Sequence, residues 1–227
     1  MAQLIQTDIP APHGILEGLL RLPDHMATSA EEATQTGAPL PTIAAVVCHP
    51  HPQFGGTMHN KVVFRLSAAL VEQGIPALRF NFRGVGRSTG VWDNGTGESD
   101  DVRAALDALA ERYPGTPLLL AGFSFGAWVG LPVGCADPRV THLVGAGVPV
   151  SLLSTDTLAG CVKPKLIVQG EQDEYGPRPA LEQWFGRLSE PKRLTIVPGA
   201  DHFFTHQQTE FTAALSDGLR TWNLSRG

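Results

Sequence analysis

Hydrophobic and polar positions follow two different periods along this chain. Short, nearly continuous apolar runs, typical of buried strands, alternate with segments in which apolar residues recur every three or four positions. In residues 98–112, for example, Val102, Leu106 and Leu109 are spaced four and three residues apart, which predicts an amphipathic helix. Strand and helix patterns that alternate in this way predict an α/β fold with a mostly parallel sheet.

The predicted elements cover most of the chain. Residues 3–7 and 15–21 are expected to form an antiparallel pair of strands, and further strands are expected at residues 42–48, 76–80, 117–121, 140–147, 165–169 and 193–197. Helices are expected at residues 61–73, 98–112, 178–188 and 209–222. Residues 27–41 show no periodicity and predict a flexible surface loop. The sequence contains no internal repeat, and its composition does not change along the chain. Residues 1–227 are therefore expected to form a single domain.

Composition narrows the class of protein. The chain is 42% hydrophobic and 17% charged, which is typical of a soluble globular domain. Its net charge of -5, without a basic cluster, argues against a nucleic-acid or anionic-membrane partner. No apolar run approaches the length of a membrane span, and residues 1–10 show no secretory signal.

The cysteines bear on the compartment. The chain has three cysteines, an odd number, and they lie far apart in the sequence: Cys48, Cys135 and Cys161. This spacing is typical of buried free thiols in a reducing compartment and not of a disulfide framework. A cytoplasmic location is therefore expected.

The most informative motif is Gly-x-Ser-x-Gly at residues 122–126, which follows the apolar run at residues 117–121. A serine at such a strand-to-helix turn is held in a strained backbone conformation that exposes its hydroxyl, and the flanking glycines prevent clashes. Ser124 is thus a candidate nucleophile. The alternative is a serine that only caps the following helix.

A nucleophilic serine needs a base, and the base needs a carboxylate that sets its tautomer. Asp173 follows the predicted strand at residues 165–169, and His202 follows the one at residues 193–197. Because sites in open α/β sheets lie outside the carboxyl ends of the strands, Ser124, Asp173 and His202 are expected to converge there.

Other residues near these positions are weaker candidates. Glu171 and Glu174 flank Asp173 and are alternatives for the acid or solvated loop charges. Asp201 adjoins His202, but an immediate neighbour rarely points at the same imidazole. His206 is interpreted as a solvated or packing side chain.

A second motif, His-Pro-His-Pro-x-x-Gly-Gly-Thr at residues 49–57, follows the predicted strand at residues 42–48. On this fold, a loop at that position supplies one backbone amide to the oxyanion hole, and the residue after the nucleophile, here Phe125, supplies the other. Since proline cannot donate, His51 is the first choice within the loop and Gln53 the second. Two alternatives are a merely stiffened loop and a His-x-His metal site, which is not expected because no acidic or cysteine ligand lies nearby.

With these residues, the chain resembles the α/β-hydrolases, and more narrowly the small bacterial serine hydrolases related to dienelactone hydrolase. Residues 49–57 match the His-Pro-His-Pro loop, and residues 83–90 resemble the Arg-Gly-x-Gly-x-Ser-x-Gly loop common in the superfamily. The resemblance extends from about residue 14 to the C-terminus. It implies Ser124, Asp173 and His202 as the catalytic triad on an eight-stranded sheet flanked by helices. Dienelactone hydrolase itself has cysteine in place of Ser124, so lactone specificity is not implied.

The glycines of residues 83–90 do not predict a nucleotide site, because their spacing is one residue off the dinucleotide fingerprint and no P-loop motif occurs. No cofactor is expected. Arg83 and Arg87 are interpreted as ion-pair partners within the fold, with a role in binding a substrate carboxylate as the alternative.

Only a short loop, residues 148–164, is available where many lipases insert a helical lid. An open crevice without a large lid is expected, with Phe54 and Trp128 lining an acyl pocket or, alternatively, packing in the core. The sequence as a whole predicts a serine hydrolase that cleaves carboxylic esters of small to medium acyl chains. The alternatives are a thioesterase, an amidase or peptidase, and a non-catalytic binding protein of the same fold.

Overall fold

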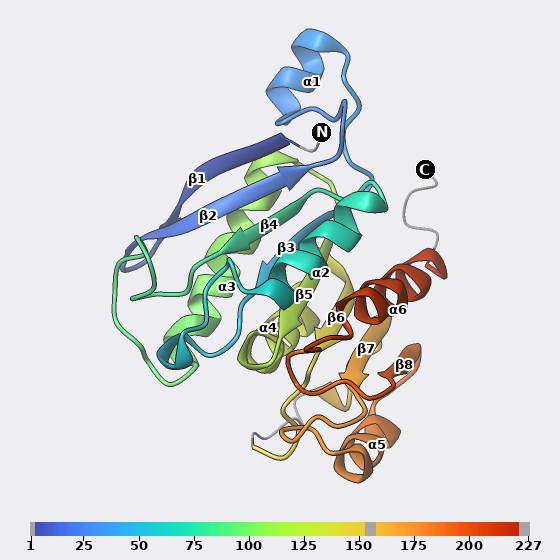
Figure 1. The fold of residues 1–227 in the computed structure, drawn as a ribbon. Helices are drawn as coiled ribbons and strands as arrows, with labels where there is room; N and C mark the ends of the chain where they lie inside the picture. The colour runs from blue at the N-terminus through green and yellow to red at the C-terminus, as the bar shows by residue number, and fades with distance from the viewer. Residues whose placement is uncertain (1–2, 153–157, 223–227) are drawn as a thin grey trace.

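In the computed structural model, which describes residues 3–152 and 158–222, one eight-stranded sheet runs through the molecule (Figure 1). The strand order is β1-β2-β4-β3-β5-β6-β7-β8. The strands are β1 (Gln3–Ala11), β2 (Gly14–Leu22), β3 (Ala44–Cys48), β4 (Ala77–Phe80), β5 (Leu118–Phe123), β6 (Val140–Ala146), β7 (Lys165–Gly170) and β8 (Lys192–Val197). β1 and β2 pair antiparallel, β2 also pairs antiparallel with β4, and all the other pairs are parallel.

Helices cover both faces of this sheet (Figure 1). The hydrophobic core on one face is closed by α2 (Lys61–Glu72) and α6 (Gln208–Arg220). On the other face it is closed by α3 (Thr96–Arg112), α4 (Phe125–Ala136) and α5 (Arg178–Arg187). The predicted α/β-hydrolase architecture, a mostly parallel sheet between helices, is confirmed. Among the helices of the described residues, none is both long enough and apolar enough to cross a membrane.

The central strands explain where the site forms. Every residue of β3, β5 and β7 is buried, because helices cover both faces of these strands. The parallel strands β3, β5, β7 and β8 end at the same edge of the sheet. The segments that follow these four strands contain His49, Ser124, Asp173 and His202.

One predicted loop is in part a helix. Within residues 27–41, α1 (Ala30–Thr36) begins after Ser29, whose side chain accepts a hydrogen bond from the Glu32 amide, and ends at Gly37 with φ 74°. None of its residues is buried, so no hydrophobic periodicity marks it in the sequence. The prediction of a flexible surface loop was wrong for residues 30–36, because only the capping residues signal this helix in the sequence.

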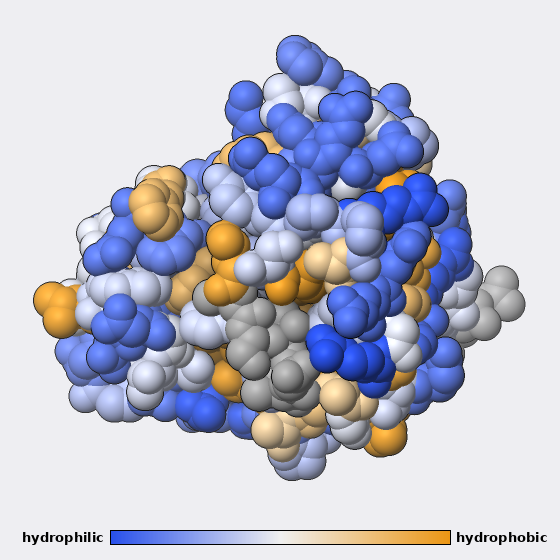
Figure 2. All heavy atoms as spheres, turned by 90° about the horizontal axis from the view of Figure 1, so that it is seen from below, coloured by the Kyte–Doolittle hydropathy of each residue, from blue (hydrophilic) through white to orange (hydrophobic). Residues whose placement is uncertain are grey.

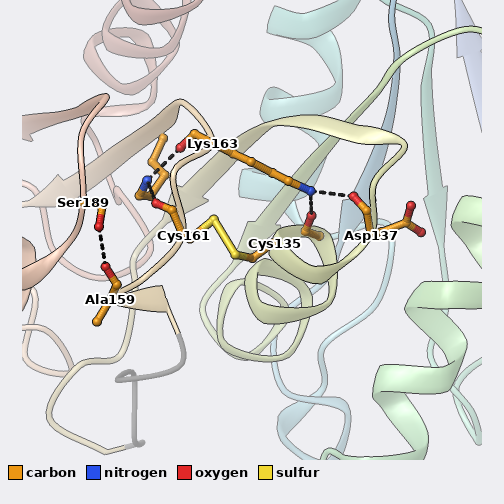
Figure 3. Close-up of a disulfide and its surroundings, with 8 residues drawn as sticks. Cys135, Asp137, Ala159, Cys161, Lys163 and Ser189 are labelled. Atoms are coloured by element: carbon orange, nitrogen blue, oxygen red, sulfur yellow. Dashed lines mark hydrogen bonds between the residues drawn. A yellow bond between two sulfur atoms is a disulfide. The ribbon is translucent and has the colours of Figure 1, made fainter.

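The cysteine prediction was wrong for two of the three residues. Cys135, on α4, and Cys161, before β7, form a disulfide with a Cα–Cα distance of 5.9 Å (Figure 3). Residues 26 positions apart meet because the chain returns alongside α4 before it enters β7. Lys163 strengthens this junction, since its Nζ donates hydrogen bonds to the carbonyl oxygens of Gly134 and Asp137. Cys48 is free and buried, as predicted, but the argument from free thiols to a reducing compartment no longer holds, and a cytoplasmic location stays a prediction.

Candidate active site

Ser124 lies at the sharp turn between β5 and α4. Its φ of 54° is rare for a residue other than glycine and costs about 1–3 kcal/mol, which the surrounding packing must offset. The turn is possible because of the two glycines that flank it. A Cβ at Gly122 would lie 2.4 Å from the Gly126 carbonyl oxygen, and one at Gly126 would lie 2.5 Å from the carbonyl oxygens of Cys48 and His49.

Three side chains from separate loops form one hydrogen-bonded line. The Nε2 atom of His202 lies 2.9 Å from Oγ of Ser124, and its Nδ1 lies 2.8 Å from Oδ2 of Asp173. His202 and Asp173 are 4% and 2% exposed, so water hardly competes for these hydrogen bonds. Nδ1–H of His202 donates to Asp173, which leaves Nε2 without a proton and able to accept that of the Ser124 hydroxyl.

The Asp173 carboxylate accepts four hydrogen bonds. Its Oδ1 accepts from the amides of Tyr175 and Gly176, at 2.9 and 3.1 Å. Its Oδ2 accepts from Nε2 of Gln169 at 2.8 Å, in addition to the contact with His202. These donors fix the orientation of the carboxylate and satisfy its buried charge.

The other candidate acids have different partners. Glu171 accepts a hydrogen bond from the Gly199 amide. Asp201 accepts from the amides of Phe203 and Thr205, so it holds the turn that carries His202 and not the imidazole. Glu174 is exposed.

The His202 ring is packed between aromatic rings. The ring of Phe123 lies 5.1 Å from it, that of Tyr175 4.6 Å and that of Phe203 5.0 Å, measured between centroids. On a further side lies Gly147, where an added Cβ would lie 3.2 Å from Cε1 of the imidazole. These contacts restrict the ring to an orientation in which it bridges Ser124 and Asp173.

His49 fixes the loop that follows β3. Its Nε2 accepts a hydrogen bond from the Phe82 amide at 3.0 Å, and its Nδ1 lies 2.6 Å from the Pro50 carbonyl oxygen. The imidazole is therefore the neutral Nδ1–H tautomer. Burial lowers the pKa of His49 to about 4. Both nitrogens are used within the protein, so His49 and His51 do not form a chelating pair, and no group of three candidate metal ligands occurs among the described residues.

The two first-choice amides for the oxyanion hole border the same cavity as Ser124. His51 and Phe125 both line this cavity, and their rings lie 5.0 Å apart. Within residues 3–152 and 158–222, neither amide donates a hydrogen bond to another protein group. Gln53 differs, because its amide donates to Nδ1 of His51 and the residue does not line the cavity.

The two arginines of residues 83–90 form ion pairs within the fold. Nη2 of Arg83 lies 2.8 Å from the fully buried carboxylate of Asp101, and Nε donates to both oxygens of that group. Arg87 pairs with Glu17 at 3.2 Å and with Asp8 at 3.3 Å. Both arginines have carboxylate partners, so the interpretation as ion-pair partners fits the geometry.

The hydroxyl of Ser124 opens into a cavity of about 520 Å³, a size typical of small-molecule sites. Phe54 and Trp128 both line it, and their role in binding an acyl group stays a prediction. Residues 147–164 join β6 to β7 here, and in the described residues no inserted helical domain covers the cavity. Figure 2 looks onto this end of the molecule and shows hydrophobic groups near the middle of a largely polar face.

Sequence comparison agrees with this geometry. A family model described as alpha/beta hydrolase domain matches residues 45–217. The chain belongs to this alpha/beta hydrolase family. It is 39% identical over 199 residues to Uncharacterized protein RP471 of Rickettsia prowazekii, covering 84% of this chain and 82% of the relative.

Two solved structures are similar over nearly their whole length. XC6422 of Xanthomonas campestris, described as an α/β serine hydrolase without lid, is 34% identical with a TM-score of 0.84; the match covers 97% of this chain and 95% of that one. An α/β serine hydrolase homologue from Coxiella burnetii is 36% identical with a TM-score of 0.84, covering 95% and 97%. These hydrolases support the superfamily, whereas the narrower relationship to dienelactone hydrolase stays a prediction.

Several residues that line the cavity were not predicted from the sequence. Trp92, Asn94, Tyr175 and Phe203 line the cavity together with the predicted residues. They lie in loops outside the regular strands and helices, where no periodicity marks them. The signal available in the sequence was an aromatic residue within two positions of a predicted site residue, which applies to Tyr175 and Phe203 but not to Trp92.

Proposed function

We propose that this protein is a cofactor-independent serine hydrolase that cleaves carboxylic esters of small to medium acyl groups. The observation that carries the proposal is the buried line from Asp173 through His202 to Ser124, which ends in an open cavity. A hydrolase-fold protein that only binds ligands would not need three loops to hold this line together.

In the proposed mechanism, Nε2 of His202 takes the proton of Ser124 while Oγ attacks the acyl carbon. The amides of Phe125 and His51 stabilise the negative charge on the carbonyl oxygen. His202 then protonates the leaving alcohol, and the acyl group stays on Ser124 as an ester. A water molecule, deprotonated by His202, attacks this ester. His202 then returns the proton to Oγ of Ser124 as the acid leaves, which restores the free enzyme.

The openness of the cavity supports soluble substrates of limited acyl length. Each methylene that enters the cavity adds about 0.8 kcal/mol of binding, or about a fourfold change in kcat/KM. This gain should stop once the acyl chain extends beyond the cavity into water. Thioesters fit the same chemistry, because a thiolate leaves without help from His202.

Hydrolysis of matched acyl donors tests the proposal. Esters, thioesters and amides with the same acyl group should be compared on the wild-type protein and on Ser124→Ala. We expect ester turnover to rise over the first few acyl carbons, level off, and be lost in Ser124→Ala. Turnover of thioesters or amides alone would replace the ester proposal, and ester turnover that survives in Ser124→Ala would overturn it.

A further inference from the structure

One side of the cavity is a continuous series of aromatic rings. His51 lies 4.6 Å from Phe54 and 4.6 Å from Trp92, measured between ring centroids. Trp92 lies 5.2 Å from Phe125, which in turn lies 5.6 Å from Trp128. All five residues line the cavity that contains Ser124.

The rings of Trp92, His51 and Trp128 are held in place by contacts within the protein. Nε1 of Trp92 donates to Oδ1 of Asn94 at 3.2 Å, and the His51 ring accepts a hydrogen bond from the Gln53 amide. Trp128 packs so closely on Gly95 that a Cβ there would lie 2.7 Å from the indole. A ligand ring that docks against these walls would therefore cost little additional ordering of side chains.

Phe54 extends this series of rings to the mouth of the cavity. The residue is 85% exposed, although its ring lies 4.6 Å from that of His51 at a tilt of 59°. An exposed aromatic ring at the rim of an apolar cavity is typical of a ligand-binding surface.

The geometry of the reaction assigns this wall to one part of the substrate. In the proposed mechanism the leaving alcohol takes its proton from Nε2 of His202, so the alcohol lies on the side of His202, Tyr175 and Phe203. The acyl group lies away from His202, toward the wall formed by Trp92, Trp128 and Phe54. Asn94, which accepts a hydrogen bond from Nε1 of Trp92, is a polar residue beside this wall.

We propose that the preferred substrates are esters whose acyl group carries an aromatic ring, which docks against Trp92 and Trp128. This inference rests on the proposed function and narrows its substrate class. Offset or edge-to-face contacts between rings contribute about 0.5–1.5 kcal/mol beyond the area that they bury. A saturated ring of the same size lacks that contribution, although it is at least as hydrophobic.

A matched pair of substrates separates ring recognition from simple burial. Methyl 3-phenylpropanoate and methyl 3-cyclohexylpropanoate have the same leaving group, and two methylenes insulate the carbonyl from the ring. We expect kcat/KM to be about 2–13 times higher for the phenyl ester, the fold-change that corresponds to the ring contribution. In Trp92→Leu and Trp128→Leu the ratio should fall to one or below, whereas in Trp222→Leu, whose ring packs on His142 away from the cavity, it should not change.

Binding of the two esters to Ser124→Ala tests ring recognition separately from hydrolysis. Calorimetric titration of that variant with the two esters measures ring preference without turnover, and we expect tighter binding of the phenyl ester. If the wild-type protein hydrolyses neither ester but Ser124→Ala prefers the phenyl ester, the proposed function fails and the aromatic site stands. Equal or tighter binding and turnover of the cyclohexyl ester would overturn the aromatic site, even if esters are hydrolysed. If the ratio of kcat/KM for the two esters is the same in Trp92→Leu and Trp128→Leu as in the wild-type protein, the aromatic ring does not bind against this wall.

Discussion

The buried imidazole of His49 accepts a hydrogen bond from the backbone amide of Phe82, with 3.0 Å between Nε2 and the amide nitrogen. This contact joins the loop after β3 to the chain that follows β4. Since His51 lies two residues farther along the same loop, His49 positions one wall of the cavity without touching a substrate. Its protonation would place a second donor opposite the Phe82 amide and break the contact.

Acid should therefore destabilise the protein through His49. The pKa of His49 is about 4 in the folded protein, against an ordinary value of 6.5, because burial penalises the charged form. Between these two values the unfolded chain binds the proton and the folded protein does not, so stability falls as the pH falls. The part of the free energy of unfolding that depends on a neutral His49 is fully present above about pH 6.5. Roughly 3 kcal/mol of it is lost by pH 4.

Chemical unfolding from pH 7 to pH 4 measures this effect. In His49→Gln the amide oxygen can accept from Phe82 without titrating, so its free energy of unfolding should depend less steeply on pH than that of the wild-type protein. Parallel pH curves for the two proteins would show that His49 is not the titrating group.

The disulfide between Cys135 and Cys161 predicts a cost on reduction. It closes a loop across 26 positions, and loops of this size typically contribute about 2–4 kcal/mol of stability. Urea unfolding should show a lower midpoint for the wild-type protein in the presence of reductant and for the double variant Cys135→Ser/Cys161→Ser. Reductant should not affect the double variant. Identical midpoints for all samples would indicate that Cys135 and Cys161 are free thiols, as predicted from the sequence.

The close packing at the turn between β5 and α4 predicts that alanine substitution affects stability very differently at two glycines. Gly126→Ala places a Cβ 2.5 Å from the carbonyl oxygens of Cys48 and His49, so it should lower stability and abolish turnover. Gly186→Ala in α5 meets no atom within 4 Å and should leave the protein as stable or up to about 1 kcal/mol more stable. Thermal unfolding of both variants tests the difference. A stable, active Gly126→Ala would contradict the observed geometry of the turn that carries Ser124.

The acid can be tested against its neighbour in the same loop. Asp173→Asn puts an amide donor or a weak acceptor opposite Nδ1 of His202, which unsettles the required tautomer, and kcat should fall roughly a thousandfold or more. Glu171→Gln is the matched control, because Glu171 binds the Gly199 amide, and its kcat should stay near that of the wild-type protein. The reverse result would move the role of the acid to Glu171.

Residues that lie directly after predicted strands were predicted well from the sequence. The apolar runs placed β5, β7 and β8, and their carboxyl ends placed Ser124, Asp173 and His202 at one edge of the sheet. Features without such a periodic signal were missed. The helix α1 has no buried face, and the disulfide depends on how the chain returns past α4. Trp92 reaches the cavity from an irregular loop, which ion pairs of Arg83 and Arg87 join to the rest of the fold.

The central claim, an activated Ser124, is tested most directly by covalent labelling. A fluorophosphonate probe reacts with a serine whose hydroxyl proton is taken up by a neighbouring base, so it should add once to the wild-type protein. Intact-mass analysis and peptide mapping should place the adduct on Ser124, with labelling abolished in Ser124→Ala and strongly slowed in His202→Gln. Labelling of Ser124→Ala to the same extent as the wild-type protein would contradict the account.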